Sequence, residues 1–282
     1  MNVLSIQSEV VYGHVGNSAA RFALQRLGHE AWCVPTIILS SHPGHKGFAG
    51  EATSAALLGK LVDALGVQGR FAEADGVISG YLGSPEQAEI VAATVRAVKS
   101  ANPAASYCLD SVFGDDGRIY ARPGVAEAMA QNLLPLADIV TPNAFELSTL
   151  AGLPVRDASE GLTAAQALHR PIVVATSVPH EGRIGTLVVA GDEAWLASTP
   201  KIENAPRGPG DLFAALFFGQ TLNGRTPAQA MELAARATYH VLAPSAGAPE
   251  MRLVAEQDAL VLPPRPADFR LEKLETRRLA VG

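Results

Sequence analysis

The sequence has little of several features that would assign a protein to a specialised class. Only two of its 282 residues are cysteines, Cys33 and Cys108, so neither a disulfide framework nor a cysteine-based zinc site is expected. No apolar run approaches the roughly 20 residues that span a bilayer. The first residues lack the basic start and long apolar stretch of a signal peptide. We therefore expect a cytoplasmic protein with no membrane partner.

Positive charge is also scarce. The chain has 22 Lys and Arg residues against 28 Asp and Glu residues, a formal net charge of -6, and no basic cluster spans it. Nucleic acids are bound by grouped Lys and Arg side chains, so we expect no nucleic-acid partner. A small anionic ligand remains compatible with this composition, because a few backbone N–H groups suffice to bind it.

Apolar residues are abundant, at 48% of the chain, which is enough for a sizeable core. Short apolar runs that suit strands alternate with stretches whose apolar residues recur at helical spacing. The predicted strands are residues 3–6, 30–35, 76–80, 106–110, 139–141 and 172–176, and the predicted helices are residues 17–27, 54–65, 84–99, 125–134 and those that begin near 143, 210 and 226. This alternation predicts an α/β fold with a central, mostly parallel sheet and helices on both faces.

Two local patterns add detail. Residues 186–190 and 194–198 flank a Gly191-Asp192 turn and predict an antiparallel hairpin at one edge of the sheet. Ser84 and Gln87 stand at the start of a predicted helix with the spacing of a capping box.

The C-terminal region has a weaker pattern. Residues 252–262 fit either a strand or a helix. The Pro- and Arg-rich tail that begins near residue 263 and includes Arg277 and Arg278 is expected to be a surface segment. With no internal repeat and no long linker, residues 1–282 are predicted to form a single domain.

The most informative segment is Gly208-Pro209-Gly210-Asp211, a glycine-rich turn that leads directly into an apolar helix. Unpaired N–H groups at a helix N-terminus can bind a phosphate oxyanion, and Asp211 could accept a proton from a hydroxyl that attacks the phosphate. Asp211 could equally be a simple helix cap. The third glycine of a dinucleotide-binding motif is absent because Phe213 stands there, and no P-loop occurs anywhere.

Acidic residues follow two predicted strands. Asp110 ends one strand, and Asn143 and Glu146 lie in the first turn of the helix after another. Ligands of open α/β sheets bind at the carboxyl ends of strands, and Mg²⁺ takes few protein ligands and keeps several waters. Ordinary helix-start chemistry would explain the Asn143 and Glu146 pair as well, and Asp115 and Asp116 suit an exposed loop.

Two N-terminal loops should project at the same sheet edge. Ser8 and residues 11–18 follow the first strand, and residues 40–48, with His42 and His45, follow the second. Hydroxyl groups, a planar histidine and an aromatic ring could hold a small planar heterocycle. The two histidines form no metal-binding pattern with a third ligand.

Taken together, these segments resemble the pyridoxal kinases of the ribokinase-like superfamily over nearly the whole chain, to about Leu262. Three runs carry the resemblance to this subgroup: Ile6-Gln7-Ser8, residues 10–18 and residues 79–84. Asn143-Ala144-Phe145-Glu146 and Gly208-Pro209-Gly210-Asp211 match two motifs that the superfamily shares with sugar and pyrimidine kinases. The fold that the resemblance implies is a three-layer sandwich.

The resemblance also implies an activity, the ATP-dependent phosphorylation of the 5′-hydroxymethyl group of pyridoxal and related B6 vitamers in B6 salvage. Asp211 would be the base on that hydroxyl, and the amides around Gly208 and Gly210 would hold the developing phosphate charge. Asp110 and Glu146 would position Mg²⁺, largely through water.

The remaining site residues come from the resemblance alone. Thr141, Asn143 and Thr176 match nucleotide-contacting positions, which Asp110 and Glu146 also join. Ser8 and the loop of Pro43, Gly44 and His45 would contact the pyridine ring. Relatives of this kind are commonly homodimers, and a monovalent cation such as K⁺ would suit the superfamily.

Several positions depart from the pattern of the family. Ser111 stands in place of a proline after Asp110, and Pro43 in place of a substrate-facing hydroxyl. His45 and Phe48 replace a tyrosine and a tryptophan. Pro209, inside the glycine motif, has no N–H to donate.

Two alternatives therefore stay open beside the pyridoxal kinase hypothesis. A hydroxymethylpyrimidine kinase would use the same base and phosphate cradle on a different ring. A non-catalytic protein of the same fold would bind a B6 vitamer or a nucleotide without turnover.

Overall fold

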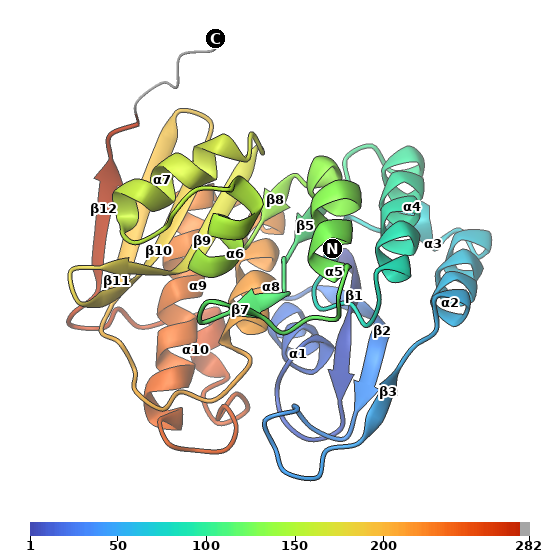
Figure 1. Ribbon diagram of the computed structural model, residues 1–282, viewed down its shortest axis with the longest axis horizontal. Helices are drawn as coiled ribbons and strands as arrows, with labels where there is room; N and C mark the ends of the chain where they lie inside the picture. Colours follow the sequence, from blue (N-terminus) through green and yellow to red (C-terminus); the bar gives the residue numbers. More distant parts are fainter. Residues whose placement is uncertain (277–282) are drawn as a thin grey trace.

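A ten-stranded sheet forms the middle layer of the protein, whose computed structural model describes residues 1–276 (Figure 1). From edge to edge the strands run β12 (Arg270–Leu274), β11 (Glu193–Thr199), β10 (Arg183–Ala190), β9 (Ile172–His180), β8 (Ile139–Val140), β5 (Ser106–Leu109), β4 (Gly76–Ser79), β1 (Asn2–Val10), β2 (Glu30–Leu39) and β3 (Gly50–Ala52). The six strands from β9 to β2 are parallel neighbours, and the pairs beyond them are antiparallel. The predicted mostly parallel sheet is confirmed, as is the hairpin of β10 and β11.

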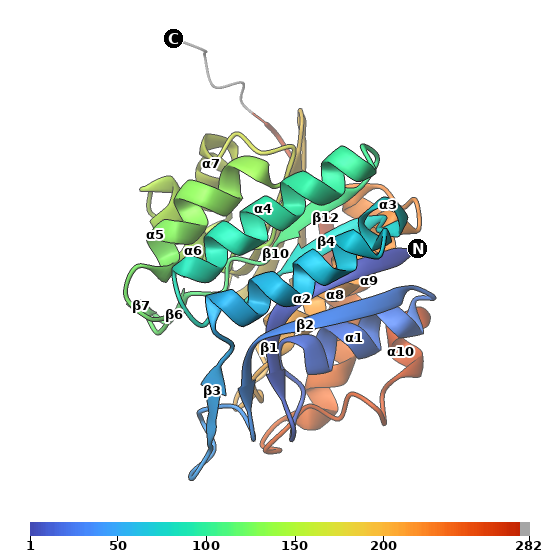
Figure 2. The ribbon, with the colours of Figure 1, turned by 90° about the vertical axis from the view of Figure 1, so that its right-hand side faces the viewer.

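Helices cover both faces of the sheet (Figures 1 and 2). One layer holds α1 (Asn17–Arg26), α8 (Pro209–Leu222), α9 (Pro227–Leu242) and α10 (Asp258–Val261), and the other holds α2 (Ala55–Val67), α3 (Arg70–Glu73), α4 (Glu86–Ala101), α5 (Val125–Ala128), α6 (Ala144–Ala151) and α7 (Ala158–Ala167). The apolar side chains divide accordingly, with one core cluster under α1, α8 and α9 and two under the opposite layer. The sandwich therefore has three layers.

Helix α8 is the most deeply buried helix of this arrangement. Residues 212–220 are buried without interruption, because α8 lies against the sheet and between α1 and α9. A helix that is apolar all round belongs in a core rather than at a surface. This packing fixes the position of the turn that precedes α8.

The carboxyl ends of the parallel strands lie at one edge of the sheet, to which β1 and β2 point at the bottom of Figure 1. A register shift interrupts the pairing of β1 and β2 between Gln7 and Glu9. The extra residue of this bulge is in β2, where Thr36 and Ile37 together stand opposite Ser8 of β1. A two-stranded ribbon of β6 (Gly114–Asp115) and β7 (Arg118–Ile119) follows β5 near the same edge.

Two segments before the C-terminal region differ from the predictions. The predicted capping box before α4 is wrong, because Pro85 is the N-cap residue and makes no side-chain cap. The Gln87 side chain is buried and bonds the Gly83 N–H and the carbonyl groups of Thr36 and Thr53. The helix predicted over 125–134 is α5 followed by a π turn (Met129–Leu133) and a 3₁₀ turn (Leu134–Leu136).

The C-terminal region is more ordered than expected. The segment that fits either type of structure contains a short helix, α10. Part of the expected surface tail is a strand, β12, which pairs with β11 at the edge of the sheet. Arg277 and Arg278 lie outside the described residues. Within residues 1–276, no helix is both long enough and apolar enough to cross a bilayer.

Candidate active site

The turn before α8 leaves backbone N–H groups open at the start of the helix. Gly208 is the N-cap residue and adopts a φ of 99°, and a side chain there would collide with the carbonyl oxygen of His14. A Cβ at Gly210, in contrast, would meet no atom within 4 Å. Because Pro209 has no N–H and the Leu212 N–H donates to the Gly208 carbonyl, the open donors of the first turn are those of Gly210 and Asp211.

Asp211 lies half-buried in this first turn. Burial raises the pKa of its carboxyl group to about 6, and a hydrogen bond from the Gly16 N–H opposes the rise. A carboxylate with a pKa near neutrality is suited to accept and release a proton. Asp211 is not the N-cap residue of α8, because Gly208 holds that position and no side chain caps the helix.

Asp110 follows β5 and is 3% exposed. The Thr141 hydroxyl donates to its Oδ1 atom at 2.8 Å, whereas Oδ2 is buried and has no hydrogen-bond partner within the described part of the chain. Burial raises the pKa of Asp110 well above its usual value, and the charges of Asp211 and Glu146 raise it further. A buried, unpartnered carboxylate oxygen favours a cation or an ordered water.

Glu146 is also 3% exposed and belongs to a capping box with Asn143. Its Oε1 accepts hydrogen bonds from the N–H groups of Phe113 and Gly114 at 3.0 and 3.3 Å, and its Oε2 accepts one from the Asn143 N–H at 2.9 Å. Burial raises the pKa of Glu146 to about 8. The helix-start interpretation is therefore correct, and the same carboxylate also fixes the loop after Asp110.

These carboxyl groups fit a hydrated Mg²⁺ better than a metal held by protein ligands alone. Among residues 1–276, no three His, Cys, Asp or Glu side chains are grouped closely enough to hold a metal ion. Mg²⁺ commonly takes one or two carboxylates and completes its shell with water and substrate phosphates. Oδ2 of Asp110 has no hydrogen-bond partner and Oε2 of Glu146 accepts only one hydrogen bond within the described residues, so both oxygens are available to a hydrated Mg²⁺.

Tyr120 is a site residue that the sequence interpretation did not single out. It follows β7, and its pKa is raised by burial and by the charges of Glu146, Asp211, Asp110 and Asp115. Tyr120 therefore lies near these acidic groups, although the residue is 48% exposed. The only feature of the sequence that could have indicated Tyr120 is its position in the loop after Asp110.

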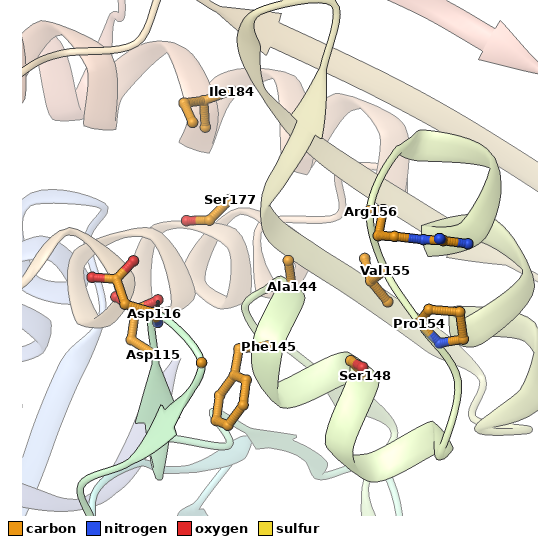
Figure 3. A pocket seen from close by; sticks show the side chains of 11 residues that line it. Asp115, Asp116, Ala144, Phe145, Ser148, Pro154, Val155, Arg156, Ser177 and Ile184 are labelled. Atoms are coloured by element: carbon orange, nitrogen blue, oxygen red, sulfur yellow. Dashed lines mark hydrogen bonds between the residues drawn. The ribbon is translucent and has the colours of Figure 1, made fainter.

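Thr176 lies next to the start of α6. Its N–H donates to the Pro142 carbonyl at 2.9 Å, and it forms a single parallel bridge with Asn143. A cavity of about 530 Å³ opens beside this pair. Figure 3 shows the side chains that line it, which come from the β6–β7 ribbon, α6, the loop before α7 and the strands β9 and β10. Ser177 and Asp115, which the sequence interpretation did not assign to a site, are among them.

Ser8 is 9% exposed, and its hydroxyl has no hydrogen-bond partner among the residues that the structure describes. A side chain at Gly16 would collide with the Ser8 carbonyl and hydroxyl oxygens. Since the Gly16 N–H also donates to Asp211, Gly16 brings the end of β1 and the start of α8 together. Ser8 is thereby close to the proposed base.

The loop of Pro43, Gly44 and His45 follows β2 and is mostly exposed. The Gly44 N–H donates to Nδ1 of His42 at 3.0 Å. His45 meets the ring of Tyr12 edge-on, with ring centroids 5.7 Å apart, and its Nε2 lies 2.6 Å from Oε1 of Glu250. Glu250 is a second residue that the sequence interpretation missed, because no local motif surrounds it.

Comparisons with known proteins agree with this geometry. The sequence model of the family described as phosphomethylpyrimidine kinase matches residues 72–251. The chain is 42% identical to a pyridoxal kinase of Rubrobacter xylanophilus, over 94% of this chain and 95% of that protein, and 41% identical to one of Deinococcus radiodurans, over 91% of each.

Solved structures give the same result. A pyridoxal kinase of Leishmania donovani in complex with ADP and pyridoxamine superimposes with a TM-score of 0.90 at 28% identity, and one of Entamoeba histolytica with a TM-score of 0.90 at 25% identity. Each covers 97% of this chain and 99% of its own. The predicted ribokinase-like fold is confirmed.

Proposed function

The chain belongs to the pyridoxal kinase family, and from this membership we propose that it transfers the γ-phosphoryl group of ATP to the 5′-hydroxymethyl group of pyridoxal and related B6 vitamers. The observation that carries the proposal is the juxtaposition of Asp211 with the glycine turn before α8 and with the charge of Asp110. Phosphoryl transfer to an alcohol needs a base for the hydroxyl proton, N–H donors for the phosphoryl oxygens and a carboxylate that can bind a cation. These residues can supply all three.

Asp211 acts as the general base in this proposal. The vitamer oxygen forms a bond to the γ-phosphorus while the bond from that phosphorus to the bridging oxygen of ATP breaks and ADP leaves. The hydroxyl proton passes to the Asp211 carboxylate, which is the main form above its pKa of about 6. The N–H groups of Gly210 and Asp211 donate to the phosphoryl oxygens, and Gly208 gives the turn the φ that aims them.

Asp110 and Glu146 hold Mg²⁺ in this proposal, largely through water. When bound, the ion neutralises phosphate charge. The chain's own contribution is to keep Oδ2 of Asp110 unpartnered and to fix Glu146 with three backbone N–H groups.

The two substrates lie on opposite sides of this centre in the proposal. Thr141, Asn143 and Thr176 contact the nucleotide, and the cavity beside Asn143 offers room for part of it. Ser8, with its free hydroxyl, contacts the pyridine ring together with Pro43, Gly44 and His45. A cytoplasmic homodimer with a site for a monovalent cation such as K⁺ completes the proposal.

A hydroxymethylpyrimidine kinase is the second candidate, because the family model that matches residues 72–251 is described as phosphomethylpyrimidine kinase. The deciding experiment measures ATP-dependent phosphorylation of pyridoxal, pyridoxamine, pyridoxine and hydroxymethylpyrimidine under the same conditions, with each product identified by mass. We expect the highest kcat/KM for one of the three B6 vitamers. Preference for hydroxymethylpyrimidine would favour the second candidate, and binding without turnover of any substrate would indicate a non-catalytic protein.

A further inference from the structure

The carboxylate of Glu250 connects two loops that are far from it in the sequence. Its Oε1 lies 2.6 Å from Nε2 of His45, and its Oε2 accepts a hydrogen bond of 3.1 Å from the backbone N–H of His14. His14 belongs to the loop of residues 11–16 after β1, and His45 to the loop of residues 42–48 after β2. We refer to these two segments as the ring loops.

Close packing supports both contacts. Gly13 adopts a φ of 100°, and a side chain there would collide with the Glu250 carboxylate. The Glu250 side chain is only 13% exposed, so its contact with His45 is better shielded from solvent than a contact between fully exposed side chains. The ring loops themselves are open to solvent, as the 53% and 45% exposure of Tyr12 and Phe48 illustrates.

Glu250 is presented from a fixed support. The neighbouring Met251 is 2% exposed and lies where a side chain at Gly208 would meet it. The N–H of Arg252 donates to the Ser245 hydroxyl, which in turn donates to the Val241 carbonyl near the end of α9. The carboxylate therefore joins the ring loops to the same region that holds the turn before α8.

We propose that Glu250 is a positioning residue that holds both ring loops in the conformation that binds the vitamer. The proposal rests on the proposed function, since it is that function which assigns the ring to these loops. Loops that are ordered before the ligand arrives lose less conformational entropy on binding. Glu250 itself acts through His14 and His45 rather than on the reacting atoms.

Steady-state kinetics test the proposal first. Glu250→Ala removes both acceptors and should raise the KM for pyridoxal about tenfold, because a hydrogen bond to a charged group has an effect of that order. The KM for ATP and kcat should stay within about twofold. Glu250→Gln keeps one acceptor oxygen for two donors and should have an intermediate effect. An equal rise in the KM for both substrates would overturn the proposal.

Glu232 provides the matched control. It is an α9 carboxylate whose side chain is 21% exposed and which pairs with Arg236 and Arg265, not with the ring loops. Glu232→Ala should leave the KM for pyridoxal unchanged. A rise equal to that of Glu250→Ala would attribute the effect to general destabilisation and overturn the positioning role.

A double-mutant cycle isolates the pair of Glu250 and His45. His45→Phe keeps a ring to meet Tyr12 and removes Nε2. If the pair transmits the effect, His45→Phe should raise the KM for pyridoxal much less in the Glu250→Ala background than in the parent. Fully additive effects would contradict the proposal.

Amide hydrogen exchange of the free protein gives a readout that does not depend on activity. Exchange in residues 11–16 and 42–48 should be faster in Glu250→Ala and unchanged in Glu232→Ala. Unchanged exchange in Glu250→Ala would overturn the proposal, as would faster exchange with an unchanged KM. If the parent phosphorylated no B6 vitamer, the proposed function would be wrong. The exchange rates of Glu250→Ala would still show whether Glu250 orders the loops.

Discussion

Three carboxyl groups, those of Asp110, Glu146 and Asp211, converge at one edge of the sheet, and burial raises the pKa of each. The charges of Glu146 and Asp211 also raise the pKa of Asp110, so the three groups act on one another electrostatically. Negatively charged carboxylates that are buried near one another raise the free energy of the folded state unless a cation binds beside them. The arrangement of these residues therefore suits a site that binds a cation together with phosphate groups.

Asp110→Asn tests the metal role of a single atom. The substitution can keep the acceptor for the Thr141 hydroxyl and removes the charge from the buried end of the side chain. We expect the Mg²⁺ concentration for half-maximal turnover to rise about tenfold or more. Asp63→Asn, a change at an exposed carboxylate of α2, should leave the Mg²⁺ titration unchanged. The same titration curve for Asp110→Asn and the parent would remove Asp110 from the metal site.

At the scale of the element, the start of α8 depends on two glycines with different roles. Gly208 has a positive φ and no room for a side chain beside His14, whereas Gly210 has a helical position and open space around it. Gly208 is thus required by the fold of the turn. The fold tolerates a side chain at Gly210, and such a side chain would obstruct only a ligand that approaches the backbone there.

The two alanine substitutions should therefore separate stability from activity. Gly208→Ala should lower the free energy of unfolding by more than about 1 kcal/mol and abolish most turnover. Gly210→Ala should leave that free energy equal or up to about 1 kcal/mol higher, while it raises the KM for ATP. Denaturant unfolding and steady-state kinetics measure both effects. A loss of stability in Gly210→Ala as large as that in Gly208→Ala would contradict this division.

Elements with a strong local pattern were predictable. The apolar run after Asp211 predicted α8, and Thr226-Pro227 marked the start of α9. The Gln87 side chain forms no capping box, because it bonds the carbonyl groups of Thr36 in β2 and of Thr53 just after β3, and no local sequence pattern reveals those contacts. The strand β12 was missed because its residues are mostly exposed and pair only at an edge.

At the scale of the whole molecule, the site is assembled from both halves of the chain. The rule that ligands bind at the carboxyl ends of parallel strands was enough to predict Asp110 and Glu146 at one edge, whereas Ser8, which was predicted to follow the first strand, lies within β1. It could not identify Glu250 or Tyr120. Glu250 is 205 residues from the histidine it contacts, and Tyr120 is recognised only by the charges that surround it in space.

The raised pKa of Glu146 also affects the stability of the whole protein. Folding raises this pKa from about 4.5 to about 8, so between these values the folded state binds the proton more tightly than the unfolded state. The free energy of unfolding of the Mg²⁺-free protein should therefore decrease from about pH 7 to pH 8, by at most about 1.4 kcal/mol per pH unit. His14, His29 and His42, whose pKa values burial lowers, bind protons mainly in the unfolded chain and therefore oppose part of this decrease near pH 7, so the comparison with a variant that lacks only the Glu146 carboxyl group isolates the effect.

Glu146→Gln is the control for this pH dependence. The variant has no carboxyl group to titrate, so its free energy of unfolding should change less over the same range. Urea unfolding at several pH values measures both proteins. A free energy that is constant or rises with pH in the parent would show that the Glu146 pKa is not raised by folding.

The most direct test of the account is the kcat of Asp211→Asn for the phosphorylation of pyridoxal. Asparagine keeps the size of the side chain and removes the proton acceptor, so the fold and ATP binding should persist. Because a positioned general base accelerates a reaction about 10²–10⁴-fold, we predict a loss of that order in kcat. A variant that melts at the parent's temperature and turns over within a few-fold of the parent would contradict the account, and Asp211 would then be only a residue of the helix start.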